Sequence, residues 1–368
     1  MESCRLRLNK YSKAYRRRLL SGGELLHRFL QKHGLSWSKF IKQQSSAIDE
    51  CLEQFVTACH NENESGVNMR GTKHAILFIQ VMRPDLKHKL RRTWDTIRAW
   101  EESLPSGMRT PLPLALLIAM ICQARLVAME AETGRSKSEK MLRVSALLGL
   151  GFFGLLRPGE LLNLQRRHVN LPNSLTFALP AITISIIKPK NFRQLGTSQF
   201  TTVSQPDVCN WVVWCCSDLQ PHEMLWKHSH TEFRRLFKEL TAQLEFANCK
   251  FTPASLRAGG ATCLFDTHMD VGRLRLQGRW ASAQSLEHYV QVGKSQQILQ
   301  QMQERSIEKV QSLLQRGSFL LQLPGFLQTH LPGHHLVVSK PFNCHGQGII
   351  RACRDWACMG EKDEKDHR

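Results

Sequence analysis

The sequence predicts a mainly α-helical protein of the α+β class, with two domains and one small β-hairpin. Apolar residues recur at helical spacing over most of the chain, and the stretch "AITISIIKPK", at residues 181–190, shows the alternation of a half-buried strand. A segment rich in turn residues, "ESLPSGMRTPLP" at residues 102–113, separates two helical regions. The chain has 368 residues, which is enough for each region to bury its own core.

The part before this segment is expected to hold a basic arm and a helical domain. Residues 1–45 are basic and only partly periodic, so we expect a basic N-terminal arm there. Its Arg-rich, acid-poor start is typical of a transit peptide, a nuclear signal and a DNA-contacting arm alike. Residues 46–112 are expected to form a helical domain, since "SSAIDECLEQFVTAC" places one apolar face after a serine cap, made by Ile48, Leu52, Phe55 and Val56.

A second helix of this domain is expected over residues 84–100, in "PDLKHKLRRTWDTIRAW". Its apolar face is expected to consist of Leu86, Leu90, Trp94 and Ile97. Its outer face is cationic and is formed by Lys87, Lys89, Arg91 and Arg92. A solvated surface helix carries such a face too, so this pattern alone does not identify a binding surface.

The second domain is expected over residues 113–316 and is again mostly helical. Two helices come first, in "LALLIAMICQARLVAME" and "SEKMLRVSALLGLGFFG". The alternating strand follows, "NFRQLG" turns the chain, and "TSQFTTV" runs back as the second strand of the hairpin. Further helices are expected from "PDVCNWVVWCCSDL" onward to "SIEKVQSLLQR", one of them carrying Tyr289. Residues 317–368 are expected to form an irregular C-terminal tail.

The charge balance points to a polyanionic partner. Lys and Arg number 50 against 31 Asp and Glu, a formal excess of 19. A domain this basic usually meets nucleic acid, although a generally basic proteome would produce the same excess. No apolar run approaches the ~20 residues that a membrane span needs, so we expect no membrane partner. The twelve cysteines form no Cys-x-x-Cys pair and are read as reduced thiols. We therefore expect an intracellular protein, located in the nucleus of a eukaryotic host and otherwise in the cytoplasm or nucleoid.

Two arginines of the second domain stand near predicted helix starts. Arg157 precedes Pro158 in "GLLRPGELLNL", and Glu160, one turn on, is placed to orient its guanidinium. Arg257 lies in "TPASLRAGGAT", where the paired glycines indicate close helix packing or close backbone approach. A helix N-terminus favours anions, and an arginine fork matches a phosphate, so two such arginines could hold one phosphodiester between them.

A lysine, a tryptophan and a tyrosine complete the candidate set. Lys190 lies at the end of the predicted strand with Lys188 close by, and either could give a proton to a leaving oxygen. Trp280 and Tyr289 follow in "GRWASAQSLEHYV", and Tyr289 is the third of only three tyrosines. A tyrosine hydroxyl has an ordinary pKa of about 10, so it becomes a useful nucleophile only where cations lower the cost of ionisation.

This set resembles the tyrosine recombinases, also called the phage integrase family, which share a catalytic fold with type IB topoisomerases. "GLLRPGELLNL" is similar to their first-arginine motif, "IKPKN" to their hairpin lysine, "SLRAGGAT" to their second-arginine motif and "GRWASAQSLEHYV" to their terminal block. The spacings of 23 residues from Arg257 to Trp280 and nine from Trp280 to Tyr289 fit the family's layout. The likeness covers residues 141–300 and extends to a helical core-binding domain at residues 46–130.

The resemblance implies a two-domain clamp around duplex DNA and a site-specific recombinase or integrase reaction. Arg157 and Arg257 would bind the scissile phosphate, Trp280 would support it and Lys190 or Lys188 would act as general acid. Tyr289 would attack and hold the 3′-phosphate, without a metal or a small-molecule cofactor. The family resemblance further implies a homo-tetramer on paired DNA sites and an origin in a mobile element. Lys87, Lys89, Arg91 and Arg92 would then contact DNA from the first domain.

One departure from the family pattern leaves other functions open. The family has His-x-x-Arg at its second arginine, whereas Ala254 stands at the histidine position here. An alanine neither carries a proton nor contacts a phosphate through its side chain, which favours a catalytically impaired, repurposed DNA-binding protein as the alternative. A topoisomerase-like enzyme that relaxes DNA without a partner site, and an RNA-binding helical protein that rests on charge alone, are further alternatives.

Overall fold

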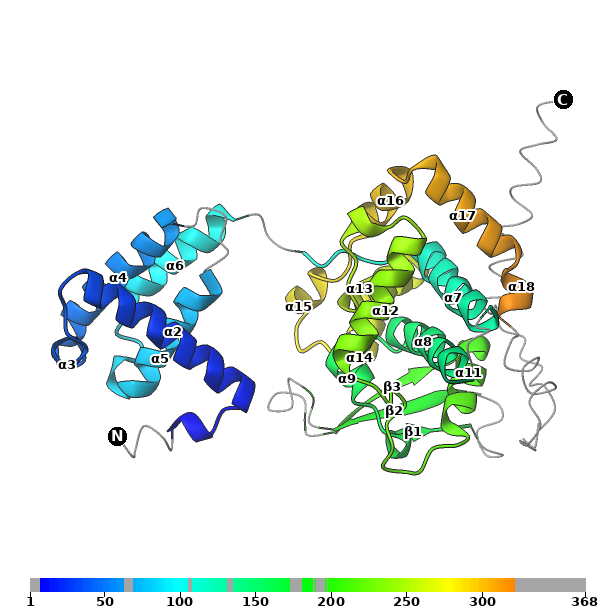
Figure 1. The fold of residues 1–368 in the computed structure, drawn as a ribbon, viewed down its shortest axis with the longest axis horizontal. Coiled ribbons are helices and arrows are strands. Elements are labelled where there is room, and N and C mark those ends of the chain that lie inside the picture. Colours follow the sequence, from blue (N-terminus) through cyan, green and yellow to red (C-terminus); the bar gives the residue numbers. More distant parts are fainter. Residues whose placement is uncertain are drawn as a thin grey trace. The chain divides into compact units, whose positions relative to one another are not determined.

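The computed structural model describes residues 7–62, 69–104, 108–130, 135–172, 181–187, 189, 196 and 198–321. The chain divides into two compact units, a first unit at Met1–Gly107 and a second unit at Met108–Arg368, and each is considered by itself. Their elements are labelled in Figure 1. The predicted fold class is confirmed, since the described residues are mostly helical and include one small antiparallel sheet.

The first unit is a small helical bundle. Its elements are α2 (Lys13–Lys32), α3 (Trp37–Phe40), α4 (Ser45–Glu62), α5 (Met69–Met82), η1 (Pro84–Leu86) and α6 (Arg91–Ser103). The face expected on α4 is buried as predicted, and it packs in one core with Leu26 and Leu30 of α2. Much of the segment expected as a basic arm therefore folds as α2 and α3. The basic residues of α2 alternate with a narrow apolar stripe, which packs along α5.

The helix expected over residues 84–100 is divided into two elements. The chain forms η1, turns through His88 at a φ of 70°, and begins α6 only at Arg91. Lys87 and Lys89 thus lie in the turn and not on the helix, a correction of the expectation. The carboxylate of Asp49, buried on α4, fixes the start of α6 by accepting from the backbone N–H of Thr93 at 3.0 Å. The predicted apolar residues are still buried, apart from partly exposed Trp94.

The second unit is larger and is again mostly helical. Its helices are α7 (Leu114–Met129), α8 (Arg135–Phe153), α9 (Pro158–Leu162), η2 (Arg166–His168), α11 (Pro206–Cys216), α12 (His230–Gln243), η3 (Ala247–Cys249), α13 (Ala254–His268), α14 (Val271–Gly278), α15 (Ala283–Glu287), α16 (Val292–Gln300), α17 (Glu304–Gln315) and α18 (Gly317–Leu320). Helix α7 is apolar on all sides from Leu114 to Cys122 and is buried without interruption from Ala115 to Cys122, so it forms the centre of the core. Helices α8, α12, α13, α17 and α18 all contact it.

A three-stranded antiparallel sheet belongs to the same unit. It has the order β1 (Val169–Asn170), β2 (Ile182–Ile187) and β3 (Ser198–Val203), with Ile184 paired to Thr201. The predicted hairpin is β2–β3, and its alternating isoleucines are buried as expected. Strand β1 was not anticipated, because two residues are too few for a periodic signal. Lys188 and Lys190, between β2 and β3, lie outside the described residues.

The end of the described chain is anchored to the core. Helix α18 begins at Gly317, where an irregular tail was expected, and the Leu321 carbonyl accepts a hydrogen bond from Trp211 Nε1 at 3.1 Å. Residues 322–368 lie outside the described part. Among the described helices, none combines the length and apolar character needed to cross a bilayer.

Candidate functional site

Arg157 lies immediately before α9, at the position where that helix is capped. Pro158 occupies the first helical position, where its missing N–H leaves no hydrogen bond unmade. The carboxylate of Glu160 accepts from the backbone N–H of Arg157 at 3.0 Å and from its Nη1 at 2.6 Å. The same short motif therefore starts the helix and fixes the direction of the guanidinium.

Arg257 lies in the first turn of α13 and is 1% exposed. Its Nη1 donates to the carbonyl of Leu155, and its Nη2 donates to that of Gly278 at 2.6 Å. Burial lowers the pKa of this guanidinium, and the positive charges of Arg279 and Arg157 lower it further. A buried cation of this kind is stabilised by any anion that enters beside it.

The two glycines after Arg257 explain how α13 comes so close to its neighbours. A Cβ on Gly259 would lie 2.0 Å from the carbonyl oxygen of Leu112, and one on Gly260 would lie 2.1 Å from that of Phe152. Any larger residue would push the helix away from α8 and from the segment before α7. The close backbone approach expected from the paired glycines is therefore present.

Arg279 is a further buried arginine, and it was not identified from the sequence. Its side chain is 4% exposed, and its Nη2 lies 2.9 Å from Glu160 Oε2 and 3.2 Å from the carbonyl of Leu155. It follows α14 in a left-handed conformation, with a φ of 57°. Its place between Gly278 and Trp280 was the one sequence feature that could have indicated a site residue. An arginine in a predicted turn is normally exposed, so this feature was not used.

Glu160 consequently bridges two arginines, Arg157 and Arg279. Burial by itself raises the pKa of this carboxyl group. The charges of Arg279 and Arg157, together with the hydrogen bonds from Arg157, outweigh burial and hold the pKa below its ordinary value. Glu160 is therefore ionised at neutral pH, and it orients both guanidinium groups.

Trp280 and Tyr289 pack against each other beside Arg257. Their ring centroids are 5.2 Å apart, and the Arg257 Cζ lies 4.4 Å from the Trp280 ring and 5.3 Å from the Tyr289 ring. Trp280 is 6% exposed, and its indole Nε1 has no hydrogen-bond partner in the described part of the chain. Both aromatic faces therefore support the buried cation.

Tyr289 does not lie on a helix, contrary to the expectation. Helix α15 ends at Glu287, and Tyr289 lies in the turn that follows, with its N–H donating to the carbonyl of Leu286 at 2.8 Å. Its own carbonyl accepts from Thr262 Oγ1 at 3.1 Å, which ties the turn to α13. Leu286, Tyr289 and Val290 keep a helical spacing, so the sequence pattern does not reveal this helix end. The side chain is half-buried.

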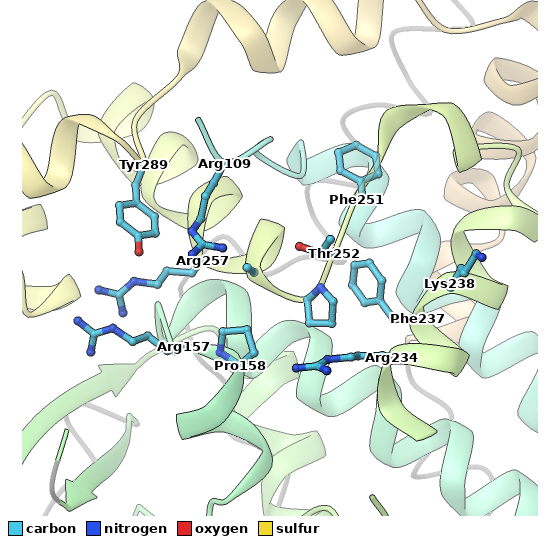
Figure 2. Close-up of a pocket in the computed structure, with 12 residues that line it drawn as sticks. Arg109, Arg157, Pro158, Arg234, Phe237, Lys238, Phe251, Thr252, Arg257 and Tyr289 are labelled. Atoms are coloured by element: carbon cyan, nitrogen blue, oxygen red, sulfur yellow. The ribbon is translucent and has the colours of Figure 1, made fainter. Parts of the chain in front are cut away.

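Arg157, Arg257 and Tyr289 line a cavity of about 570 Å³. Figure 2 shows the hydroxyl of Tyr289 pointing towards the side where the guanidinium groups of Arg157 and Arg257 lie. The described lining also includes Arg109, Arg234, Lys238 and Ala254, and it contains no acidic residue. Of these, Arg109, Arg234 and Lys238 were not identified from the sequence, where each resembles an ordinary surface cation. Such a lining is suited to an anion.

The candidate lysines and the DNA-contacting cations of the predicted set are not among the residues that line this cavity. The neighbours of Lys188, Ile187 and Pro189, line a cavity of about 440 Å³ together with Arg157, while both candidate lysines are outside the described residues. The four cations expected to contact DNA from the first unit are exposed.

No group of three or more His, Cys, Asp or Glu side chains suited to a metal was found among the residues that the structure describes.

Comparisons with known proteins gave matches in structure alone. No family model matches the chain, and no curated protein matches its sequence. The XerH site-specific recombinase in a post-cleavage complex with its difH substrate is 15% identical, at a TM-score of 0.40, over 77% of this chain and 94% of that one. The XerA recombinase is 12% identical, at a TM-score of 0.35, over 86% of this chain and 100% of that one.

The Tn1549 transposon integrase in complex with a circular intermediate DNA is a third similar structure. It is 10% identical to this chain, at a TM-score of 0.44, over 76% of this chain and 99% of that one. Identities and TM-scores at this level do not extend to the chemistry of a site. The function is therefore inferred from the residues of this chain.

Proposed function

We propose that this protein breaks and rejoins DNA strands as a tyrosine recombinase does, through a 3′-phosphotyrosine intermediate. One observation carries the proposal. The Tyr289 side chain opens into the same cavity as Arg157 and Arg257, and no acidic residue stands among the described lining residues. A nucleophile aimed at a site for an anion is the arrangement that phosphoryl transfer requires.

In the proposed reaction, Tyr289 Oη forms a bond to the scissile phosphorus while the bond to the 5′-oxygen breaks. The tyrosine proton passes to water, and the leaving oxygen takes a proton from Lys190 or Lys188. Negative charge increases on the non-bridging oxygens, where two guanidinium groups stabilise it. A 5′-hydroxyl of another strand then attacks the phosphotyrosine, so the energy of the phosphodiester is conserved.

The surroundings of the site support this assignment. Glu160, itself paired with Arg279, holds Arg157 in place, and Arg257 is fixed by two backbone carbonyls and two aromatic rings. Trp280 supports the site through its ring, which packs on the buried Arg257 guanidinium. Preorganised guanidinium donors of this kind need no rearrangement when charge develops.

The remaining parts of the proposal concern DNA binding and assembly. A core-binding domain at residues 46–112 would hold duplex DNA through the exposed cations Lys87, Lys89, Arg91 and Arg92. The catalytic domain would span residues 113–316 and act as a homo-tetramer on two DNA sites. Integration of a mobile element is the corresponding biological role, in the nucleus if the host is eukaryotic and otherwise in the cytoplasm or nucleoid.

A second candidate function is supported by Ala254. Its methyl group lines the cavity, and it offers no proton donor or acceptor at that wall. A chain that binds duplex DNA without cutting it would retain the cationic cavity and lose the reaction. In that case Ala254→His is the first substitution to examine for recovery of cleavage.

Covalent trapping distinguishes the two functions. The full-length chain is incubated with a library of nicked duplexes in chelator, denatured, and the DNA that remains attached is sequenced. An adduct that Tyr289→Phe abolishes supports the enzyme and yields its target sequence. Tight duplex binding with no adduct would leave a DNA-binding protein.

A further inference from the structure

We infer that Arg109 is a third phosphate-binding arginine of the catalytic site. Its guanidinium contacts the scissile phosphate from the side of the cavity where Ala254 provides only a methyl group. The inference rests on the proposed function and adds a catalytic residue to it. Arg109 lines the cavity together with Arg157, Arg257 and Tyr289. Figure 2 shows its side chain between Tyr289 and Thr252, directed into the cavity.

The backbone that carries Arg109 is held at both sides of the site. The Arg109 carbonyl accepts from Gln291 Nε2 at 2.8 Å, two residues beyond Tyr289. Three residues on, the N–H of Leu112 donates to the carbonyl of Ser255 at 3.1 Å, in the turn of α13 that carries Arg257. The segment is therefore fixed to the nucleophile's turn and to the helix of the second arginine, so the entry of this side chain into the cavity is built into the fold.

The guanidinium of Arg109 differs from those of Arg157 and Arg257 in its hydrogen-bond partners. Arg157 donates to Glu160, and Arg257 donates to the carbonyls of Leu155 and Gly278. The Arg109 guanidinium makes neither a hydrogen bond nor an ion pair with the described residues. Only the backbone carbonyl of Arg109 is bonded to one of them, Gln291. As far as the described residues go, all five of its N–H donors are open to a ligand, in a fork that matches the oxygens of a phosphate.

Electrostatics also favours an anion at this position. Three arginines open into one cavity whose described lining has no acidic residue, and Arg234 adds a further positive charge. Like charges confined in this way repel one another, and the repulsion is relieved when a phosphate enters. The transition state of phosphoryl transfer carries more negative charge than the bound diester, so a third guanidinium lowers the barrier. A guanidinium stays protonated and cannot accept the Tyr289 proton, so Arg109 acts as a phosphate ligand and not as a base.

The test compares two forms of the duplex selected by covalent trapping, one with a normal phosphodiester and one with a methylphosphonate at the scissile position. A methylphosphonate lacks the negative charge of the diester, so a cation that acts by neutralising charge matters less on it. Arg109→Ala is expected to slow adduct formation on the order of 100-fold on the phosphodiester. On the methylphosphonate the loss is expected to fall below about tenfold, and Arg109→Lys is expected to restore part of the rate on the diester.

The matched control is Arg235→Ala, which removes the same charge from α12. The Arg235 guanidinium is held by Glu232 and Glu239 and does not line the cavity, so its loss is expected to leave the rate within about threefold of wild type. A rate reduction in Arg109→Ala that is equal on both substrates would show a purely structural role for the segment and would overturn the inference. A reduction below about threefold on the diester would overturn it as well.

A binding measurement separates failure of this inference from failure of the proposed function. If wild-type protein forms no adduct on any duplex, the enzymatic proposal fails. Arg109 is then judged from the slope of log affinity against log salt, whose magnitude falls by about 0.9 when a variant neutralises one phosphate fewer on duplex DNA. A slope that Arg109→Ala leaves equal to that of Arg235→Ala would overturn the inference, and a shallower slope would retain Arg109 as a phosphate ligand.

Discussion

Glu160→Gln should destabilise the second unit by about 3 kcal/mol at pH 7, because it leaves two arginines without their shared counter-ion. The Glu160 side chain is 11% exposed, and its oxygens lie 2.6 Å from Arg157 Nη1 and 2.9 Å from Arg279 Nη2. Removing one partner of a buried ion pair costs about 3–5 kcal/mol. Arg157 is 23% exposed and regains part of its hydration, which places the cost at the lower end.

The difference in unfolding free energy between wild type and Glu160→Gln should decrease as the pH falls. The pKa of Glu160 is held below its ordinary value in the folded protein, so the unfolded chain takes up the proton first as pH falls. The stabilisation by the carboxylate is therefore fully present above the ordinary glutamate pKa of about 4.3. It is lost as pH falls through the lower pKa of the folded state.

The assay is urea unfolding of the full-length chain, followed by tryptophan fluorescence, at pH 7, 5, 4 and 3. The free-energy difference between wild type and Glu160→Gln should be constant from pH 7 to 5 and should decrease below pH 4. Glu308→Gln, on the exposed face of α17, is the matched control and should stay within about 0.5 kcal/mol of wild type. A cost below about 1 kcal/mol at pH 7 would refute the buried bridge, as would a cost that does not change with pH.

Three further tests concern other features of the molecule. Gly259→Ala should cost about 2–3 kcal/mol in urea unfolding, since its Cβ would lie 2.0 Å from the Leu112 oxygen. Gly159→Ala, with no atom of the described residues within 4 Å of the added Cβ, should cost nothing, and equal costs would contradict the close approach. Asp49→Ala should lower the stability of the first unit by about 1–2 kcal/mol in thermal unfolding followed by circular dichroism, because α6 loses its cap; an unchanged melting temperature would argue against that cap. Lys87→Gln combined with Lys89→Gln should make the salt slope of duplex binding shallower by about 0.9 for each phosphate that these lysines neutralise, and an unchanged slope would exclude both from the DNA surface.

The parts of the fold that could be predicted from the sequence are those with a local periodic signal. The apolar face of α4 and the alternation of β2 follow from spacing alone, and both are buried as expected. Helix α2 was missed because its many basic residues obscure an apolar stripe that becomes visible only against α5. Strand β1, at Val169–Asn170, exists because β2 pairs with it, and pairing between distant segments leaves no local pattern.

The candidate site could be predicted in part for the same reason. Arg157, Arg257 and Tyr289 stand in recognisable motifs, and the structure brings them to one cavity. Arg109 stands in no such motif, and Arg279, although it lies inside "GRWASAQSLEHYV", has the sequence context of an exposed turn arginine. Arg279 is buried because Glu160 and the Leu155 carbonyl are both within reach. Arg109 enters the cavity because Gln291 binds its carbonyl and Ser255 binds the N–H of Leu112 in the same segment. Their positions depend on partners between 119 and 182 residues away in the chain, which spacing cannot reveal.

Identification of the residue that becomes attached to DNA tests the central claim most directly. The covalent complex is digested with nuclease and trypsin, and the peptides are sequenced by mass spectrometry. We expect a nucleotide remnant on the peptide of residues 280–294, "WASAQSLEHYVQVGK", with fragmentation locating it on Tyr289. A remnant on Ser282, Ser285 or any other residue, or no modified peptide at all from protein bound to its best duplex, would contradict the claim that Tyr289 is the nucleophile.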